Sequence, residues 1–272
     1  MELRGIDVSN FHGKIHWDKV KEDGIEFAII RAGWYKNNID PRFRANIEEA
    51  IKQDIKIGVY WYIYAKDESE ARANAKKCYD IIAPYLPSVK MGVWGVWSYD
   101  SDKYYKNLTK AKRTQFIKVF CDTLSGCGCH AGYFVDNAYL TKISTTVLSD
   151  YPQWLALYAT SKGNNEPLMW QYQSSGKVSG IIPRVDMNIC YDDINQYSNY
   201  CDYKKYPKLT KGSVGDKVTL LQSMLSEKGF LTTGVTGVYD PETYQSVKEF
   251  QTSKELTVDG IVGPKTWSAL MN

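Results

Sequence analysis

Residues 27–65, FAIIRAGWYKNNIDPRFRANIEEAIKQDIKIGVYWYIYA, contain two apolar runs separated by an amphipathic segment. The runs FAIIRAG (27–33) and IGVYWYIYA (57–65) are typical of buried β-strands. The segment PRFRANIEEAIKQD (41–54) between them has a helical pattern. An order of strand, helix and strand predicts parallel neighbouring strands joined by a helix.

The same alternation continues through most of the chain. Further helical patterns occupy residues 68–85 and 109–124. The other strand-like runs are RGIDVS (4–9), GVWGVWS (92–98), AGYFVD (131–136), WLALYA (154–159), LMWQYQ (168–173) and RVDMNI (184–189). Eight candidate strands within residues 1–198 predict an α/β fold, a compact TIM-like β/α barrel, with functional residues at the carboxyl ends of the strands.

The last part of the chain has a different pattern. Residues 199–208 are polar, rich in Tyr and Lys, and are expected to be a linker. Residues 209–272 contain an internal repeat, TGVYDPETYQSVKEFQ (236–251) and DGIVGPKTWSALMN (259–272), in which Gly, apolar residues, Pro and Thr precede a short helix. Asp240 followed by Pro241 is expected to cap one of these helices. We therefore predict a second domain of three short helices around one apolar cluster.

The composition is that of an ordinary globular protein, with 272 residues, 43% hydrophobic residues and a net charge of +3. The small and dispersed charge argues against nucleic acid as a partner. No apolar run is long enough to insert in a membrane, and we expect a monomer. The opening MELRGIDVSN lacks the features of a Sec signal, so the chain is expected to be made in the cytoplasm without one.

The motif GCGCH (126–130) brings Cys127, Cys129 and His130 close together in the sequence. Structural zinc sites usually have a two-residue spacing and a second pair of ligands, neither of which the sequence supplies. We therefore expect buried free thiols, no metal and no cofactor.

Four motifs together carry a resemblance to the family-25 glycoside hydrolases, the muramidases of bacteria and phages. They are GIDVSNFHGKIHWDKVKEDGIEFAIIRAGW (5–34), DPRFRANIEEAIKQDIKIGVYWYIYA (40–65), WQYQSSGKVSGI (170–181) and VDMNICYDD (185–193). Residues 209–225 and 258–270, LTKGSVGDKVTLLQSML and VDGIVGPKTWSAL, resemble the peptidoglycan-binding module often joined to such enzymes. The resemblance implies peptidoglycan glycan strands as the partner, reached after cell lysis or by non-classical export.

The family cleaves the bond between N-acetylmuramic acid and N-acetylglucosamine with a cluster of acids at the barrel mouth. These acids are an Asp in the opening motif, an Asp-x-Glu at the end of the fourth strand, and an Asp in the closing motif. The first and last correspond to Asp7 and Asp186. The chemistry needs carboxyl groups in different environments, one protonated as a donor and others charged.

The middle pair is missing from MGVWGVWSYDSD (91–102), where Val96 stands at the Asp position and Ser98 at the Glu position. Valine holds no charge, and a serine hydroxyl is too weak an acid to protonate a leaving sugar near neutral pH. If the strand continued, Asp100 and Asp102 would lie roughly 7 and 13 Å beyond Ser98, so a rescue by Asp100 would require a shift of register.

Three further positions differ from the family pattern near strand ends. Phe134 replaces a Tyr, Asp136 an Asn, and Leu157 a Gln. We interpret Val96, Ser98, Phe134 and Leu157 as the lining of an altered pocket, changed either by natural selection or by engineering. The remaining motifs of the scaffold are intact.

Tyr62, Trp61 and Trp170 follow or end barrel strands, where their rings could stack on sugars or simply pack in the core. Trp97 is out of phase with residues 96 and 98 and is expected behind the barrel. Asp40 is expected to cap a helix that begins at Pro41, and His12 to serve the loop after the first strand.

Three functions remain open from the sequence. One is a cell-wall-binding protein on a muramidase scaffold with little or no glycosidase activity. Another is a working muramidase that uses a displaced carboxylate such as Asp100. The third is a repurposed pocket for a small apolar molecule, in which Asp7, Asp136 or Asp186 acts as a general base.

Overall fold

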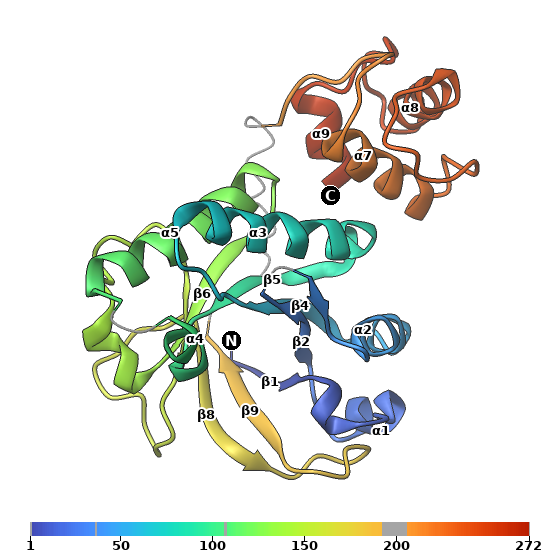
Figure 1. Ribbon diagram of the computed structural model, residues 1–272. Coiled ribbons are helices and arrows are strands. Elements are labelled where there is room, and N and C mark those ends of the chain that lie inside the picture. The colour runs from blue at the N-terminus through green and yellow to red at the C-terminus, as the bar shows by residue number, and fades with distance from the viewer. Residues whose placement is uncertain (1, 36, 106–107, 192–205, 272) are drawn as a thin grey trace.

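Eight β-strands close into a barrel in the computed structural model, which describes residues 2–35, 37–105, 108–191 and 206–271 (Figure 1). All eight predicted strands are present. They are β1 (Leu3–Val8), β2 (Phe27–Trp34), β4 (Lys56–Tyr62), β5 (Val89–Val96), β6 (Ala131–Asp136), β7 (Gln153–Ala156), β8 (Met169–Gly176) and β9 (Val185–Cys190). The short β3 (Asn38–Ile39) pairs back on β2 outside the barrel.

The strand directions correct one expectation. Strands β1, β2 and β4 to β8 run parallel to their neighbours in that series, but β9 runs antiparallel to both β8 and β1. Residues near the start of β9 therefore lie at the mouth, where the other strands end. Asp186, the second residue of β9, is directly paired with Asp7 near the end of β1.

Helices cover the outside of the first half of the barrel (Figure 1). The predicted helices are confirmed, with slightly different bounds, as α2 (Phe43–Lys52), α3 (Glu68–Ile82) and α5 (Lys110–Gly126). Two shorter helices, α1 (Trp17–Glu22) and α4 (Tyr99–Tyr104), follow β1 and β5, and 3₁₀ turns occupy Asn10–His12 (η1), Ala83–Ser88 (η2) and Asn137–Lys142 (η3). Between β6 and β9 the described chain contains no α-helix, so this side resembles a TIM barrel least.

Two apolar layers hold the barrel together. One lies between the strands and the surrounding helices and includes Trp61 and Trp97. The other fills the inside of the barrel with large side chains, among them Trp94, Trp154 and Tyr60. The interior is a packed core, as in other barrels of this size.

The C-terminal domain has the three predicted helices, α7 (Asp216–Glu227), α8 (Pro241–Ser253) and α9 (Pro264–Met271). Asp240 caps α8, as expected, by accepting a hydrogen bond from the Thr243 amide. The internal repeat is visible in two buried glutamines: Gln222 donates to the Val238 carbonyl and the Thr243 hydroxyl, and Gln251 donates to the Ile261 carbonyl and the Thr266 hydroxyl.

Polar contacts between described residues connect the two domains, and Leu86 of the barrel packs against the C-terminal core. Lys76 of α3 forms an ion pair with Asp216 at 3.0 Å, and the Tyr79 hydroxyl donates to the Asp216 carbonyl at 3.1 Å. The Tyr206 hydroxyl donates to the Gly128 carbonyl at 2.8 Å. Most of the expected linker lies outside the described residues, but Tyr206 at its end packs on Trp267 of the C-terminal core.

Cys78, Cys121 and Cys127 are free thiols, as expected, and the first two are buried. No group of three metal-ligating side chains is found among the described residues. Cys201 lies outside them. None of the described helices is long and apolar enough to cross a membrane.

Candidate functional site

The polar side of the barrel mouth is built around Asp7. Its side chain is buried, with the residue 6% exposed, and its Oδ2 atom accepts hydrogen bonds from Gln171 Nε2 at 2.7 Å and Asn188 Nδ2 at 2.8 Å. These partners come from β8 and β9, the strands that close the barrel against β1. Three strands thus converge on one carboxyl group.

Two aromatic residues fix the orientation of the amides that contact Asp7. Trp154 Nε1 donates to Asn188 Oδ1 at 2.8 Å, and the Tyr158 hydroxyl donates to Gln171 Oε1 at 2.9 Å. Because an indole nitrogen can only donate, the oxygen of Asn188 faces Trp154 and its NH₂ group faces Asp7. Asp7 therefore sits in a preorganised hydrogen-bond network.

Asp7 and Asp186 are neighbouring carboxyl groups, and both have raised pKa values. Burial raises the pKa of Asp7 well above the usual carboxyl range, and the nearby charge of Asp186 raises it further, against the amide hydrogen bonds, which lower it. Burial also raises the pKa of Asp186, and its hydrogen bond with Asp7 opposes that shift. The charge of Asp186 therefore disfavours ionisation of Asp7, as expected for two carboxyl groups that lie close together.

The opposite side of the mouth is apolar. Val96, at the end of β5, pairs in register with Tyr62 of β4 and Phe134 of β6, and it is only 2% exposed. Phe134 packs edge-on against Trp154 at a centroid distance of 4.7 Å. Val96 is thus part of the hydrophobic interior of the barrel.

Ser98 caps helix α4, a role that the sequence analysis did not predict. Its backbone is extended, and its hydroxyl accepts a hydrogen bond from the Asp100 amide, so it is the N-cap of α4. Ser101 returns the contact, because its hydroxyl accepts from the Ser98 amide at 3.3 Å. The predicted strand of residues 92–98 is confirmed as β5, which ends at Val96, and the N-cap serine Ser98 begins a helix here.

The turn into α4 separates the two nearby acids. Asp102 binds Arg113 through an ion pair at 2.8 Å and accepts a hydrogen bond from Trp97 Nε1 at 3.1 Å. Asp100 is exposed in the first turn of α4, where it lines a rim depression with Tyr64 and Tyr104. Asp136, at the end of β6, caps η3 by accepting from the Tyr139 amide at 3.2 Å.

The tryptophans singled out from the sequence are buried. Trp61 has no exposed surface, belongs to the layer outside the strands and donates to Asn74 at 3.2 Å, so its assignment to substrate binding is corrected. Trp170 is also buried and donates to the Leu157 carbonyl at 2.7 Å. Trp97 packs behind the barrel, as predicted. Leu157 is half-buried, and its side chain belongs to none of the described apolar clusters.

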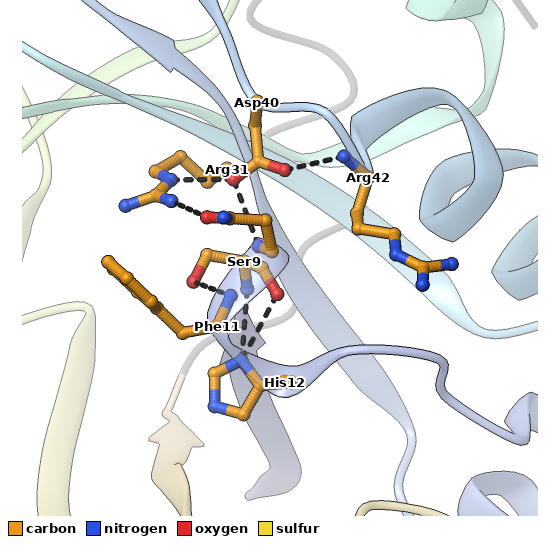
Figure 2. Close-up of polar contacts among 7 residues, drawn as sticks. Ser9, Phe11, His12, Arg31, Asp40 and Arg42 are labelled. Atoms are coloured by element: carbon orange, nitrogen blue, oxygen red, sulfur yellow. Dashed lines mark hydrogen bonds and ion pairs between the residues drawn. The ribbon is translucent and has the colours of Figure 1, made fainter.

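Figure 2 shows how Asp40 organises the loop after β1. Its Oδ2 atom forms an ion pair with Arg31 Nε at 2.7 Å and accepts from the Asn10 amide, while its Oδ1 atom accepts from the Arg42 amide at 2.8 Å. The capping role expected for Asp40 is therefore secondary to a buried ion pair. His12 serves the loop, as expected, because its Nδ1 atom accepts from the Ser9 amide.

Sequence reasoning missed the residues that hold the acid pair in place. Asn188 lies two residues after Asp186, and the period of two in a strand puts both on the same face. That signal was present in RVDMNI (184–189) and would have identified Asn188. Gln171 and Tyr158 carry no comparable signal, because their contacts with each other depend on how β7 and β8 align.

Comparisons with known proteins match the barrel and the C-terminal domain separately. The profile of "Glycosyl hydrolases family 25" matches residues 6–181, and that of "Putative peptidoglycan binding domain" matches residues 214–270. The autolytic lysozyme of Clostridium acetobutylicum is 28% identical over 276 residues, which cover 98% of this chain and 78% of that protein.

Solved structures show the same barrel. The modular autolysin LytC from Streptococcus pneumoniae has a TM-score of 0.63 and 25% identity, and the match covers 70% of this chain and 47% of LytC, less than half of that longer protein. The lysozyme of Streptomyces coelicolor has a TM-score of 0.62 and 22% identity, over 71% of this chain and 94% of the lysozyme.

Proposed function

The chain belongs to glycosyl hydrolases family 25, and on that premise we propose that it is a peptidoglycan-binding protein of the bacterial cell wall with little or no glycosidase activity. The C-terminal match to a peptidoglycan-binding domain supports the binding part of the proposal. The observation that carries the rest is the end of β5, where Val96 belongs to the apolar interior and Ser98 caps α4, while acids are present on β1, on β9 and at the end of β6.

Glycoside hydrolysis usually needs two carboxyl groups that flank the scissile bond. Asp7 and Asp186 lie beside each other and share one face of the mouth. The facing positions hold Val96, which cannot ionise, and Ser98, whose hydroxyl caps α4. Losing a positioned acid costs about 10²–10⁴ in rate. The Asp7–Asp186 pair alone therefore supports at most slow cleavage.

The experiment combines binding and lysis on purified sacculi. The chain should co-sediment with sacculi and leave their turbidity unchanged over hours. Rapid clearing would show that the remaining acids suffice for catalysis. Failure to co-sediment would refute the binding function, whatever the lysis result.

A muramidase with a displaced carboxylate is the main alternative. The exposed position of Asp100 at the rim, outside the Asp7 network, argues against it. If lysis is nevertheless observed, an Asp100→Asn variant decides the matter, because it should abolish lysis only if Asp100 is the acid.

The raised pKa of Asp7 favours one further candidate, a general base for a small apolar molecule near Val96 and Phe134. Its test is the pH profile of ester cleavage for the chain and for an Asp7→Asn variant. Equal background rates at every pH would exclude it.

A further inference from the structure

Three tyrosines form a row from the barrel mouth to its rim, and we call them the tyrosine row: Tyr62, Tyr64 and Tyr104. The rings of Tyr62 and Tyr64 are 6.1 Å apart and inclined by 20°, and those of Tyr64 and Tyr104 are 4.8 Å apart and inclined by 22°. The first ring lies in the apolar cluster inside the barrel with Val96 and Phe134. The row therefore connects the mouth to α4.

The outer end of the tyrosine row opens to solvent. Tyr104 is 58% exposed although its ring stacks on Tyr64. A depression of about 430 Å³ lies here, lined by Tyr64, Asp100, Lys103 and Tyr104. Its volume falls within the usual range of small-ligand sites, about 300–1,000 Å³. It presents aromatic surface, one carboxylate and one ammonium group.

A strained residue supports the same cluster. Tyr35 has a φ of +59°, a backbone conformation that bulky residues rarely adopt, and its amide donates to the Tyr62 carbonyl. Its ring lies 5.5 Å from that of Tyr104 and 6.4 Å from that of Tyr64. Such strain is often found at ligand sites, where the surrounding structure maintains it.

The Tyr104 ring is not needed to anchor α4 to the barrel. Helix α4 is already held by the ion pair between Asp102 and Arg113 and by the hydrogen bond from Trp97 to Asp102. Its first turn is closed by the Ser98 cap. Tyr99, on the same helix and 67% exposed, is part of none of the described ring pairs, so exposure on α4 does not by itself bring a ring into the row.

We propose that this depression binds a pyranose ring of a glycan strand, stacked on the exposed part of the Tyr104 ring and hydrogen-bonded by Asp100 and Lys103. An aromatic ring offers a flat apolar surface to the C–H face of a sugar, and a carboxylate accepts from its hydroxyl groups. The proposal rests on the proposed function, because it makes the barrel, and not only the C-terminal domain, a glycan-binding unit.

The test measures the affinity of the full-length chain for chitotetraose, a soluble N-acetylglucosamine tetramer, by titration calorimetry. Tyr104→Ala should weaken binding roughly three- to tenfold, the range expected for one aromatic stacking contact. Tyr104→Phe, which keeps the ring, should bind like the unsubstituted chain. Tyr99→Ala is the matched control and should also leave the affinity unchanged.

Two results would overturn the site. One is an unchanged affinity for chitotetraose in a folded Tyr104→Ala variant. The same result is expected if chitotetraose binds only to the C-terminal domain. The other is a chain that co-sediments with sacculi but does not bind chitotetraose. This result would refute the sugar site without contradicting the proposed function. A chain that does not co-sediment with sacculi refutes the proposed function separately.

Discussion

The raised pKa of Asp7 makes the stability of the folded chain depend on pH. The folded state raises the pKa of Asp7, mainly through burial, so folding favours the protonated form. This stabilisation is complete below the pKa of the unfolded chain and is lost as the pH rises through the raised pKa of the folded chain. The chain should therefore become less stable from acidic to neutral pH on account of this residue.

An Asp7→Asn variant mimics the protonated carboxyl, because its oxygen can accept from Gln171 and Asn188 while its NH₂ group faces Asp186. We expect its free energy of unfolding at pH 7 to rise by about 0.5–2 kcal/mol, the usual range for a stabilising substitution. Urea titrations at several pH values measure this. A variant that is less stable at pH 7 than the unsubstituted chain would contradict a protonated Asp7.

Placing acids at positions 96 and 98 tests whether these two residues limit hydrolysis. The double variant Val96→Asp/Ser98→Glu should raise the rate of sacculus lysis by about 10²-fold or more, the contribution of a positioned acid. The matched control Val96→Asn/Ser98→Gln has similar shape without the carboxyl groups and should stay inactive. A folded acidic variant with no gain in lysis would place the decisive loss elsewhere, for example at Phe134.

At the scale of elements, the sequence predicted most strands and helices because their patterns are local. The runs FAIIRAG and IGVYWYIYA became β2 and β4, and the segment between them became α2. The direction of β9 was also accessible: residues 177–184 are too few for the crossover of a dozen or more residues that parallel strands need.

The candidate site was less predictable than the fold. Asp7 and Asp186 could be identified because family motifs carry them. The role of Ser98 depended on where β5 ends, and a strand end is not fixed by an apolar pattern alone. The tyrosine row brings together residues from β4, the chain after it, and α4, and no local pattern joins them.

The two buried glutamines of the C-terminal domain, Gln222 and Gln251, hold the loops of the internal repeat through hydrogen bonds to the backbone. Gln222 accepts from the amides of Thr236 and Gly237 and donates to the Val238 carbonyl. Gln222→Met keeps the volume but leaves these buried groups without partners, so we expect a loss of about 2–4 kcal/mol in the stability of this domain. Gln245→Met, at an exposed position of α8, should change the stability of this domain by less than about 0.5 kcal/mol. Thermal unfolding measures both, and equal effects would contradict the role of Gln222.

At the scale of the whole molecule, Tyr206 links the C-terminal core to the barrel, beside the contacts of Asp216 with Lys76 and Tyr79. The Tyr206 ring packs 4.8 Å from that of Trp267, and its hydroxyl reaches the Gly128 carbonyl in the turn between α5 and β6. A Cβ atom at Gly128 would lie 1.4 Å from the Tyr206 oxygen. The two domains therefore meet at a position where only glycine fits.

A Gly128→Ala variant should weaken the coupling between the domains, because Tyr206 must move away from Gly128 and lose its hydrogen bond to the barrel. The backbone φ of +85° at Gly128 adds strain in the barrel itself. Gly126→Ala is the matched control, since a Cβ atom there meets nothing within 4 Å. We expect calorimetry to show two unfolding transitions for Gly128→Ala and an unchanged profile for Gly126→Ala. If Gly128→Ala unfolds like the unsubstituted chain, the contact through Tyr206 does not couple the domains.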